Sequence, residues 1–317
     1  MQTAGLNSQY NHSQSVIDVH NLSKHFGKKV AVDNVSLNVK RGDIFGFLGP
    51  NGSGKTTTIR MLCGLLTPDG GEGLCLGYDI VQEANAIKKE VGYMTQRFSF
   101  YEDLSIRENL DFVARVYRMP NRQKVVDATV ERLGLAHRQH QLAGALSGGW
   151  KQRLALSACM LHEPKLLLLD EPTAGVDPQA RRDFWEEIHR LANDGVTVLV
   201  STHYMDEAER CRRLGYISHG HLLAQGTPEE LIQQMGLYTW RIEGPDIYKV
   251  TADIRALPTA EQVVPYGTSL HVSGKNKQVL GEALQQWSKN ADYKVIAIDS
   301  SLEDVFIHLM QNDQDER

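Results

Sequence analysis

The stretch GPNGSGKTT, residues 49–57, constrains the fold of this chain more than any other segment. It follows the apolar run IFGFLG and opens a predicted helix from Thr56 to Leu66. Glycines at this spacing let backbone N–H groups wrap a phosphate at the positive end of a helix. The alternative is an ordinary glycine turn, but such a turn need not lie between a strand and a helix. Strand, glycine loop and helix in this order predict an α/β core that binds a nucleotide.

Each residue of this loop has an expected part in nucleotide binding. Lys55 is expected to reach the β- and γ-phosphates, and the Thr56 hydroxyl is expected to bind Mg²⁺. The remaining backbone and side chains would surround the phosphates. The predicted nucleotide-binding residues of the loop are Gly49, Pro50, Asn51, Gly52, Ser53, Gly54, Lys55, Thr56 and Thr57.

Bulk properties favour a soluble globular protein of one large domain or two smaller ones. The chain has 317 residues, 41% hydrophobic and 23% charged, and a net charge of −5 that gives no support to a nucleic-acid partner. Four scattered cysteines indicate reduced core thiols in a cytosolic compartment. No apolar run approaches the ~20 residues that span a bilayer, and the polar start does not read as a signal peptide. A role at a membrane would therefore require docking onto a separate membrane subunit.

Two further strands end in residues suited to nucleotide hydrolysis. KLLLLDEP places Asp170 and Glu171 after a buried strand, and VSTH places His203 after the next one. We expect Asp170 on the metal side, acting through water, and Glu171 polarising the attacking water. His203 would give a ring N–H to the γ-phosphate. The alternatives are a solvated loop for the acidic pair and a structural histidine.

Periodicity divides the chain into segments. Residues 16–39 alternate as antiparallel strands do, and residues 97–160 read as mostly helical, with Ser105 and Glu108 spaced as a capping box. Past residue 234 the order strand, helix, two strands, helix, strand predicts a small α+β, ferredoxin-like domain. The predicted domains are a polar tail at 1–15, an ATPase domain at 16–234 with a helical subdomain at about 97–160, and a C-terminal domain at 235–317.

The segment LSGGWKQR, from Leu146, leads to a family. Together with the phosphate loop and the DE strand it makes residues 16–234 resemble the ATP-binding subunits of ABC transporters. The resemblance implies a P-loop NTPase core with an antiparallel β subdomain and a helical subdomain. It makes Gln96 the glutamine that touches Mg²⁺ and senses the membrane subunit, and His203 the switch histidine. It also places Phe26 on the adenine ring and Asp177 in the loop TAGVD beside the nucleotide. A core strand aromatic is the alternative for Phe26.

The resemblance also explains why the chain carries a second anion-binding sequence. Ser147, Gly148 and Gly149 would cap the γ-phosphate of an ATP molecule that a facing ATPase subunit holds. Two ATP molecules would then lie between two subunits, and hydrolysis would open the dimer. Trp150 is unusual, because the family most often has glutamine there. We expect Trp150 to pack outward with a modest effect on hydrolysis.

The C-terminal sequence SSLEDVFIHLM resembles the ending of ATPase subunits in one branch of the family, the exporters of drugs, lipids and polysaccharides. This implies an integral membrane permease as partner, no nucleic acid, and a place on the cytoplasmic face of the plasma (inner) membrane. The aromatic segment RFSFYEDLS, from Arg97, would dock the permease, unless it is a locally packed loop. Three alternatives stay open: a soluble ABC ATPase acting on ribosomes or DNA, one half of a tandem ATPase, and a catalytically silent nucleotide binder.

Overall fold

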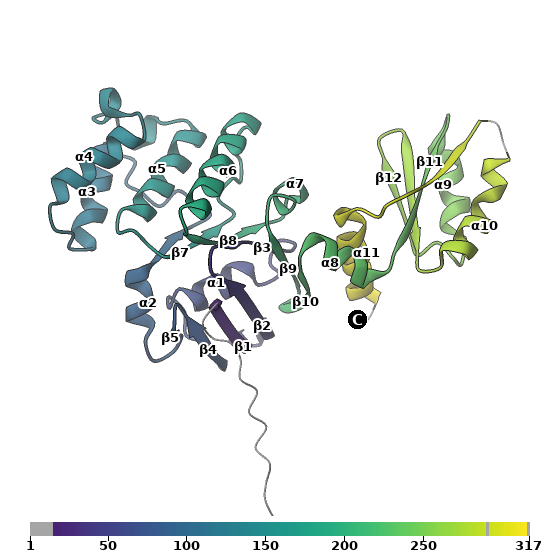
Figure 1. The fold of residues 1–317 in the computed structure, drawn as a ribbon, viewed down its shortest axis with the longest axis horizontal. Helices are drawn as coiled ribbons and strands as arrows, with labels where there is room; N and C mark the ends of the chain where they lie inside the picture. Colours follow the sequence, from purple (N-terminus) through teal and green to yellow (C-terminus); the bar gives the residue numbers. More distant parts are fainter. Residues whose placement is uncertain (1–14, 290–291, 316–317) are drawn as a thin grey trace, which may run out of the picture. The chain divides into compact units, whose positions relative to one another are not determined.

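The computed structural model describes residues 15–289 and 292–315 (Figure 1). The predicted polar tail lies outside the described residues except for Ser15, which begins the first strand. Contacts within the chain separate a first compact unit that ends at Leu222 from a second that begins at Leu223. This division assigns the helix Pro228–Met235 to the second unit, whereas our predicted boundary follows Gln234.

The first unit contains an antiparallel sheet built from the alternating segment near the N-terminus. Valines and leucines at alternating positions of the second strand are buried, which is the pattern expected of a sheet with one face on the core. The strand order is β2-β1-β4-β5. The bounds are β1 Ser15–Phe26, β2 Lys29–Lys40, β4 Gly70–Cys75 and β5 Tyr78–Asp79.

A second sheet of the first unit carries the nucleotide loop. Its order is β10-β9-β3-β8-β7-β6, and the neighbours from β9 to β6 pair in parallel. Strands β3, β7 and β8 are buried along their whole length, as continuous apolar runs in a parallel sheet should be. The bounds are β3 Ile44–Leu48, β6 Val91–Met94, β7 Leu166–Asp170, β8 Thr197–Thr202, β9 Arg213–Ser218 and β10 His221–Gly226.

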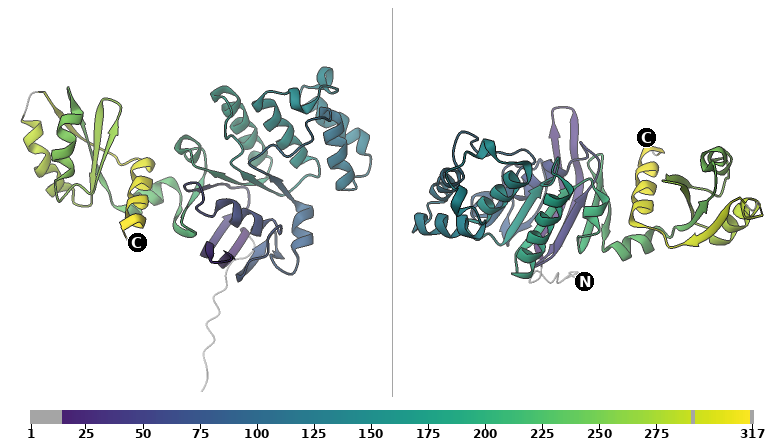
Figure 2. Two further views of the ribbon diagram at one scale, coloured as in Figure 1. Left: turned by 180° about the vertical axis from the view of Figure 1, so that it is seen from behind. Right: turned by 90° about the horizontal axis from the view of Figure 1, so that it is seen from above.

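Helices of the first unit form a helical subdomain and a set that packs near the parallel sheet (Figure 2). The predicted capping box is present: Ser105 accepts from the Glu108 amide, and the Glu108 carboxylate accepts from the Ser105 amide. The helical subdomain holds α3 Ile106–Val116, α4 Arg122–Arg132, α5 Gly148–Met160 and the short 3₁₀ turns Ala136–Arg138 and Ala143–Ala145. The others are α1 Lys55–Leu62, α2 Ala84–Glu90, α6 Pro178–Asn193 and α7 Met205–Ala208.

Helix α1 is shorter than predicted. It ends at Leu62 rather than Leu66, because Gly64 adopts a φ of 70° and turns the chain out of the helix. The amide of Leu65 then donates to the carbonyl of Arg60, and the amide of Gly64 to that of Met61. These two bonds satisfy carbonyls that the last turn would otherwise leave unpaired.

From β11 on, the second unit has the element order that the sequence predicted. Its antiparallel sheet runs β12-β13-β11-β14, and one apolar core includes Trp240, Ile242 and Trp287. This is the ferredoxin-like arrangement. The bounds are α8 Pro228–Met235, β11 Tyr238–Glu243, α9 Ile247–Arg255, β12 Gln262–Tyr266, β13 Ser269–Gly274, α10 Lys277–Ser288, β14 Lys294–Ile298 and α11 Leu302–Asp315.

Composition predicted no bilayer-spanning apolar run and reduced cysteine thiols in the core. Across the described ranges no helix is long and apolar enough to cross a bilayer. All four cysteines are free thiols, and Cys63, Cys75 and Cys211 are buried. Burial raises the pKa of the Cys63 thiol to about 11, so this group stays protonated at neutral pH.

Candidate functional site

The predicted site residues gather at one edge of the parallel sheet. Strand β8 lies between β3 and β7, with Leu48 opposite Thr202 and Ser201 opposite Asp170. The segments that leave these strands therefore start side by side. Because parallel strands share one carboxyl edge, the phosphate loop, the acidic pair and His203 face the same region, where α/β sheets bind ligands.

The phosphate loop presents an open helix N-terminus. Gly54 precedes α1 with a φ of 110°, and a side chain there would collide with the Ala31 carbonyl oxygen 2.6 Å away. In the described part of the chain no side chain caps α1, and its first turn has no acidic residue. The Ser53 hydroxyl is buried and makes no hydrogen bond with any described residue. Backbone amides and a hydroxyl are thus left for an anionic ligand.

Lys55 is buried and held inside the loop. Its ammonium donates to the carbonyls of Gly49, at 2.8 Å, and Pro50, at 3.0 Å. It also lies 3.3 Å from Oε1 of Glu171. A phosphate entering the loop would offer this ammonium a more strongly charged partner than two carbonyls.

Glu171 is the meeting point of the site. The backbone of Glu171 has a left-handed φ of 46°, and the side chain is 9% exposed. Gln96 donates its amide Nε2 to Oε2 at 3.0 Å, and His203 Nδ1 lies 3.3 Å from the same oxygen. A strained backbone that persists in a folded protein is held by its surroundings, and such residues concentrate at functional sites. One carboxylate thus contacts side chains from three separate segments.

Asp170 and Thr56 form an oxygen-rich pair beside this carboxylate. The Thr56 hydroxyl donates to Asp170 Oδ1 at 3.1 Å, and the Ser201 hydroxyl donates to the same oxygen at 2.8 Å. The Glu171 amide in turn donates to the Ser201 hydroxyl at 3.0 Å. Mg²⁺ binds through one or two protein oxygens plus substrate phosphates, so this donor set fits the ion.

A cleft of about 460 Å³ is lined by half of the predicted site residues. Phe26 stands at it with 52% of its surface exposed, so the core alternative for this aromatic is wrong. An exposed ring beside a phosphate loop can stack on a nucleobase, and the Lys24 ammonium lies 5.9 Å from the centroid of this ring. The lining residues are Phe26, Lys29, Ala31, Asn51, Gly52, Gly54, Lys55, Thr56, Thr57, Gln96 and Glu171.

The second anion-binding sequence lies elsewhere in the first unit. Of the described residues that line the cleft, none belongs to LSGG. Ser147 is the N-cap of α5 without a side-chain cap bond, and both Ser147 and Gly148 are exposed. A Cβ on Gly149 would come within 2.5 Å of the Ala180 Cβ, so this glycine lets α5 approach α6 closely. The start of α5 is therefore exposed and lies outside the chain's own cleft, and anion binding there remains a prediction.

Asp177 has a clear structural task. Its carboxylate caps α6 by accepting from the amides of Gln179, at 3.1 Å, and Ala180, at 3.0 Å. A nucleotide contact of Asp177 remains a prediction. Ser201, whose hydroxyl bridges Asp170 and the Glu171 amide, was not predicted from the sequence. The available signal was a hydroxyl residue at the end of the buried run VTVLVST.

The predicted docking segment is partly a packed loop. Phe98 and Phe100 pack on the core of the helical subdomain, with ring centroids 5.5 Å apart. Tyr101 remains 51% exposed and contacts Phe112 edge-on at 5.2 Å. Only Tyr101 of these three aromatics therefore offers extensive surface to a partner.

Trp150 packs inward, so our expectation of outward packing is wrong. Its half-buried ring lies against the core of the helical subdomain, and the Arg153 guanidinium lies 5.1 Å from the ring centroid. Because the ring packs on this core, Trp150→Gln should change the ATPase rate less than about tenfold, or ~1.4 kcal/mol in the barrier. A steady-state ATPase assay tests this, and a larger change would mean that Trp150 acts at the phosphate contacts.

Comparisons with known proteins agree on one family. The sequence pattern described as "ABC transporter" matches residues 32–174. The chain is 46% identical over 223 residues to the probable multidrug ABC transporter ATP-binding protein YbhF of Escherichia coli (strain K12). That match covers 70% of this chain and 39% of the relative, so the chain spans well under half of its length. The Nod factor export ATP-binding protein I of Rhizobium sp. (strain N33) is 35% identical over 94% of this chain and 97% of its own.

Solved structures show the same fold. An ATP-binding cassette in its ADP conformation matches with a TM-score of 0.62 and 28% identity, covering 68% of this chain and 92% of that one. A cassette solved as a dimer in a post-hydrolysis state with ADP and Pi matches with a TM-score of 0.60 and 26% identity, covering 67% and 98%. The predicted α/β core with its antiparallel and helical parts is thus confirmed.

Proposed function

Because the chain belongs to the family of ABC transporter ATP-binding proteins, whose members are ATPases, we propose that it is the ATP-hydrolysing subunit of an exporter. The observation that carries the proposal is the environment of Glu171, where Lys55, Gln96 and His203 converge beside the phosphate loop. A base, a cation and two hydrogen-bonding side chains in one cleft are what phosphoryl transfer to water needs.

Each residue then has a defined role. Backbone amides of the loop hold the phosphates, and the Lys55 ammonium leaves its carbonyl partners to bind them. The departure of Lys55 frees Glu171 to accept a proton from the attacking water. His203 donates a ring N–H to the γ-phosphate from its position beside Glu171.

Mg²⁺ would be held by the Thr56 hydroxyl, with Gln96 and, through water, Asp170 beside it. Bound there, the ion neutralises charge that develops on the phosphate oxygens. The Ser201 hydroxyl keeps Asp170 turned toward Thr56, since both hydroxyls donate to the same carboxylate oxygen.

The complete site would need a second ATPase subunit. Ser147, Gly148 and Gly149 offer an exposed helix N-terminus that an ATP molecule held by a facing subunit can reach. ATP would close the dimer, and loss of the γ-phosphate would open it, as a ligand-driven switch between two states. The similar cassette solved as a dimer with ADP and Pi supports the dimeric arrangement.

The exporter role implies a membrane permease as partner and a place on the cytoplasmic face of the plasma (inner) membrane. It is supported by the names of the multidrug and Nod factor export relatives. Since the chain spans 39% of the YbhF relative, the facing ATPase core is either a second copy of this chain or a different core in a longer protein.

Affinity capture from detergent-solubilised membranes tests the partner. The full chain should be tagged and expressed in the organism from which it comes. Capture should then recover a polytopic membrane protein, which mass spectrometry identifies. Recovery of ribosomes or DNA instead would support the soluble-ATPase alternative, which the net charge of −5 disfavours. A chain with Lys55→Met serves as a control, because docking onto a permease does not require the phosphate loop.

A further inference from the structure

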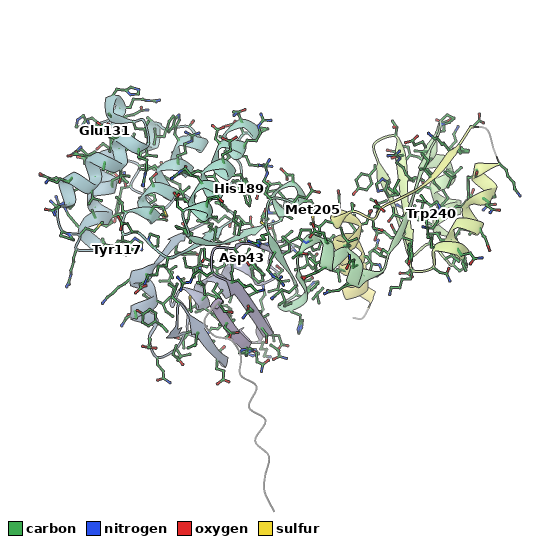
Figure 3. All side chains as sticks on the ribbon, in the orientation of Figure 1. Asp43, Tyr117, Glu131, His189, Met205 and Trp240 are labelled. Atoms are coloured by element: carbon green, nitrogen blue, oxygen red, sulfur yellow. The ribbon has the colours of Figure 1, made fainter. Side chains whose placement is uncertain are left out.

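Glu207 is a buried carboxylate that the roles above do not use. It lies on the short helix α7, which begins at Met205, labelled in Figure 3. The residue is 1% exposed. A carboxylate removed from water must be hydrogen-bonded or paired, and Glu207 has partners on both oxygens. The Thr173 hydroxyl donates to Oε1, and the Thr202 hydroxyl donates to Oε2 at 2.7 Å.

The two hydroxyls belong to the two segments that carry the hydrolytic side chains. Thr173 follows Glu171 by two positions, and Thr202 directly precedes His203. The ladder between β7 and β8 ends at Asp170 and Ser201. Just past it, the Glu171 amide donates to the Ser201 carbonyl and Thr202 pairs with Leu48 of β3, so no strand pairing joins Thr173 to His203 directly. Glu207 joins the two segments just past that point.

The direction of the Thr202 hydroxyl is fixed. The Tyr204 amide donates to its oxygen at 3.0 Å, so its hydrogen is left to donate to Glu207. Thr202 thereby orients the turn that contains His203. His203 Nδ1 in this turn lies 3.3 Å from Glu171 Oε2.

Arg181 extends this link toward the second anion-binding sequence. Its Nε lies 3.6 Å from Glu207 Oε1, and its guanidinium lies 4.4 Å from the ring centroid of Tyr204. Arg181 follows Ala180, the residue against which Gly149 packs. The buried carboxylate is thus joined through α6 to the start of α5.

We propose that Glu207 is a positioning residue for ATP hydrolysis, which holds the Glu171 segment and the His203 segment at their working separation. The proposal rests on the proposed ATPase function. Glu207 does not line the nucleotide cleft described above, so it acts on turnover through Thr173 and Thr202 and not on the binding of ATP.

Steady-state kinetics of the purified full chain test the proposal. Glu207→Gln keeps the shape but replaces one acceptor oxygen with an NH₂ group, which cannot accept from a hydroxyl. We expect kcat to fall about tenfold or more, because small displacements of reacting groups lower the rate of the chemical step. The KM for ATP should stay within about threefold of the wild-type value. Glu209→Gln is the matched control, because that side chain is exposed at the end of the same helix, and it should keep the wild-type kcat.

A second pair of variants keeps the proposal testable if Glu207→Gln does not fold. Thr202→Val removes the hydroxyl and keeps the shape, and it should lose about tenfold in kcat with KM little changed. Thr202→Ser keeps the hydroxyl and should stay within about threefold of the wild-type kcat. Wild-type kcat in either Glu207→Gln or Thr202→Val overturns the positioning role while the ATPase stands. An unmodified chain without ATPase activity overturns the proposed function itself.

Discussion

Replacing Glu171 with glutamine is expected to abolish ATP turnover while ATP binding is preserved. Glutamine has the same shape but cannot take a proton from water at neutral pH, and the loss of a general base lowers rates by about 10²–10⁴-fold. Gln96 can still donate to the remaining amide oxygen, so the cleft should keep its geometry. Nucleotide binding should change little, because the phosphate loop itself is untouched.

The variant should also accumulate as a closed dimer. When the γ-phosphate is not removed, the contacts that join two subunits persist. Size-exclusion chromatography with ATP and Mg²⁺ should therefore show a dimer for Glu171→Gln, and ADP should not replace ATP. Glu187→Gln on α6 is the matched control, since it weakens a half-exposed ion pair with Arg190 and does not line the cleft described above. Undiminished ATPase activity in Glu171→Gln would exclude Glu171 as the base.

Gly148→Asp is expected to have the second large effect. This glycine is exposed, and the atom nearest a new Cβ is the Gly175 carbonyl oxygen at 4.0 Å, so the side chain fits without disturbing α5. A carboxylate at that helix N-terminus repels a phosphate that the amides would otherwise bind. ATPase activity and ATP-driven dimerisation should both be lost.

Binding of ATP to the separate subunit should survive in Gly148→Asp, because this residue does not line the nucleotide cleft described above. Fluorescence titration with a labelled ATP analogue measures that binding, and Gly148→Ala is the control for the added carbon. If Gly148→Asp lost ATP binding to the same extent as hydrolysis, the motif would act within its own subunit.

The sequence predicted local structure where the signal lies within one segment. The strand, glycine loop and helix around Lys55 and the capping box of Ser105 and Glu108 both depend on residues a few positions apart, and both are present. Gly64 was such a signal for the early end of α1, and our prediction of a helix up to Leu66 overlooked it.

Contacts between distant segments were not predictable in the same way. The Ser201 hydroxyl meets Asp170 only because β7 and β8 are neighbours in register, and Glu207 meets Thr173 across 34 positions of sequence. A buried polar residue in an apolar run shows that a partner must exist. Which partner it has is decided by strand order and helix packing, which one sequence does not display.

Trp150 illustrates the same limit on a helix. Its place in the first turn of α5 was clear from the two preceding glycines. Its direction depends on the packing of α5 with the rest of the helical subdomain, whose core it joins. Helical periodicity states which residues share a face but not which face an unknown neighbour covers.

The central claim is that each hydrolytic site is made by two subunits. Lys55→Met disables the phosphate loop of its own chain, and Gly148→Asp disables the motif that completes the site of the facing chain, so each variant alone should be inactive. In a mixture of the two, a mixed dimer pairs the intact loop of one chain with the intact motif of the other. The ATPase activity of the 1:1 mixture should therefore rise well above that of either variant. A mixture no more active than its separate components would contradict a site shared between two copies of this chain.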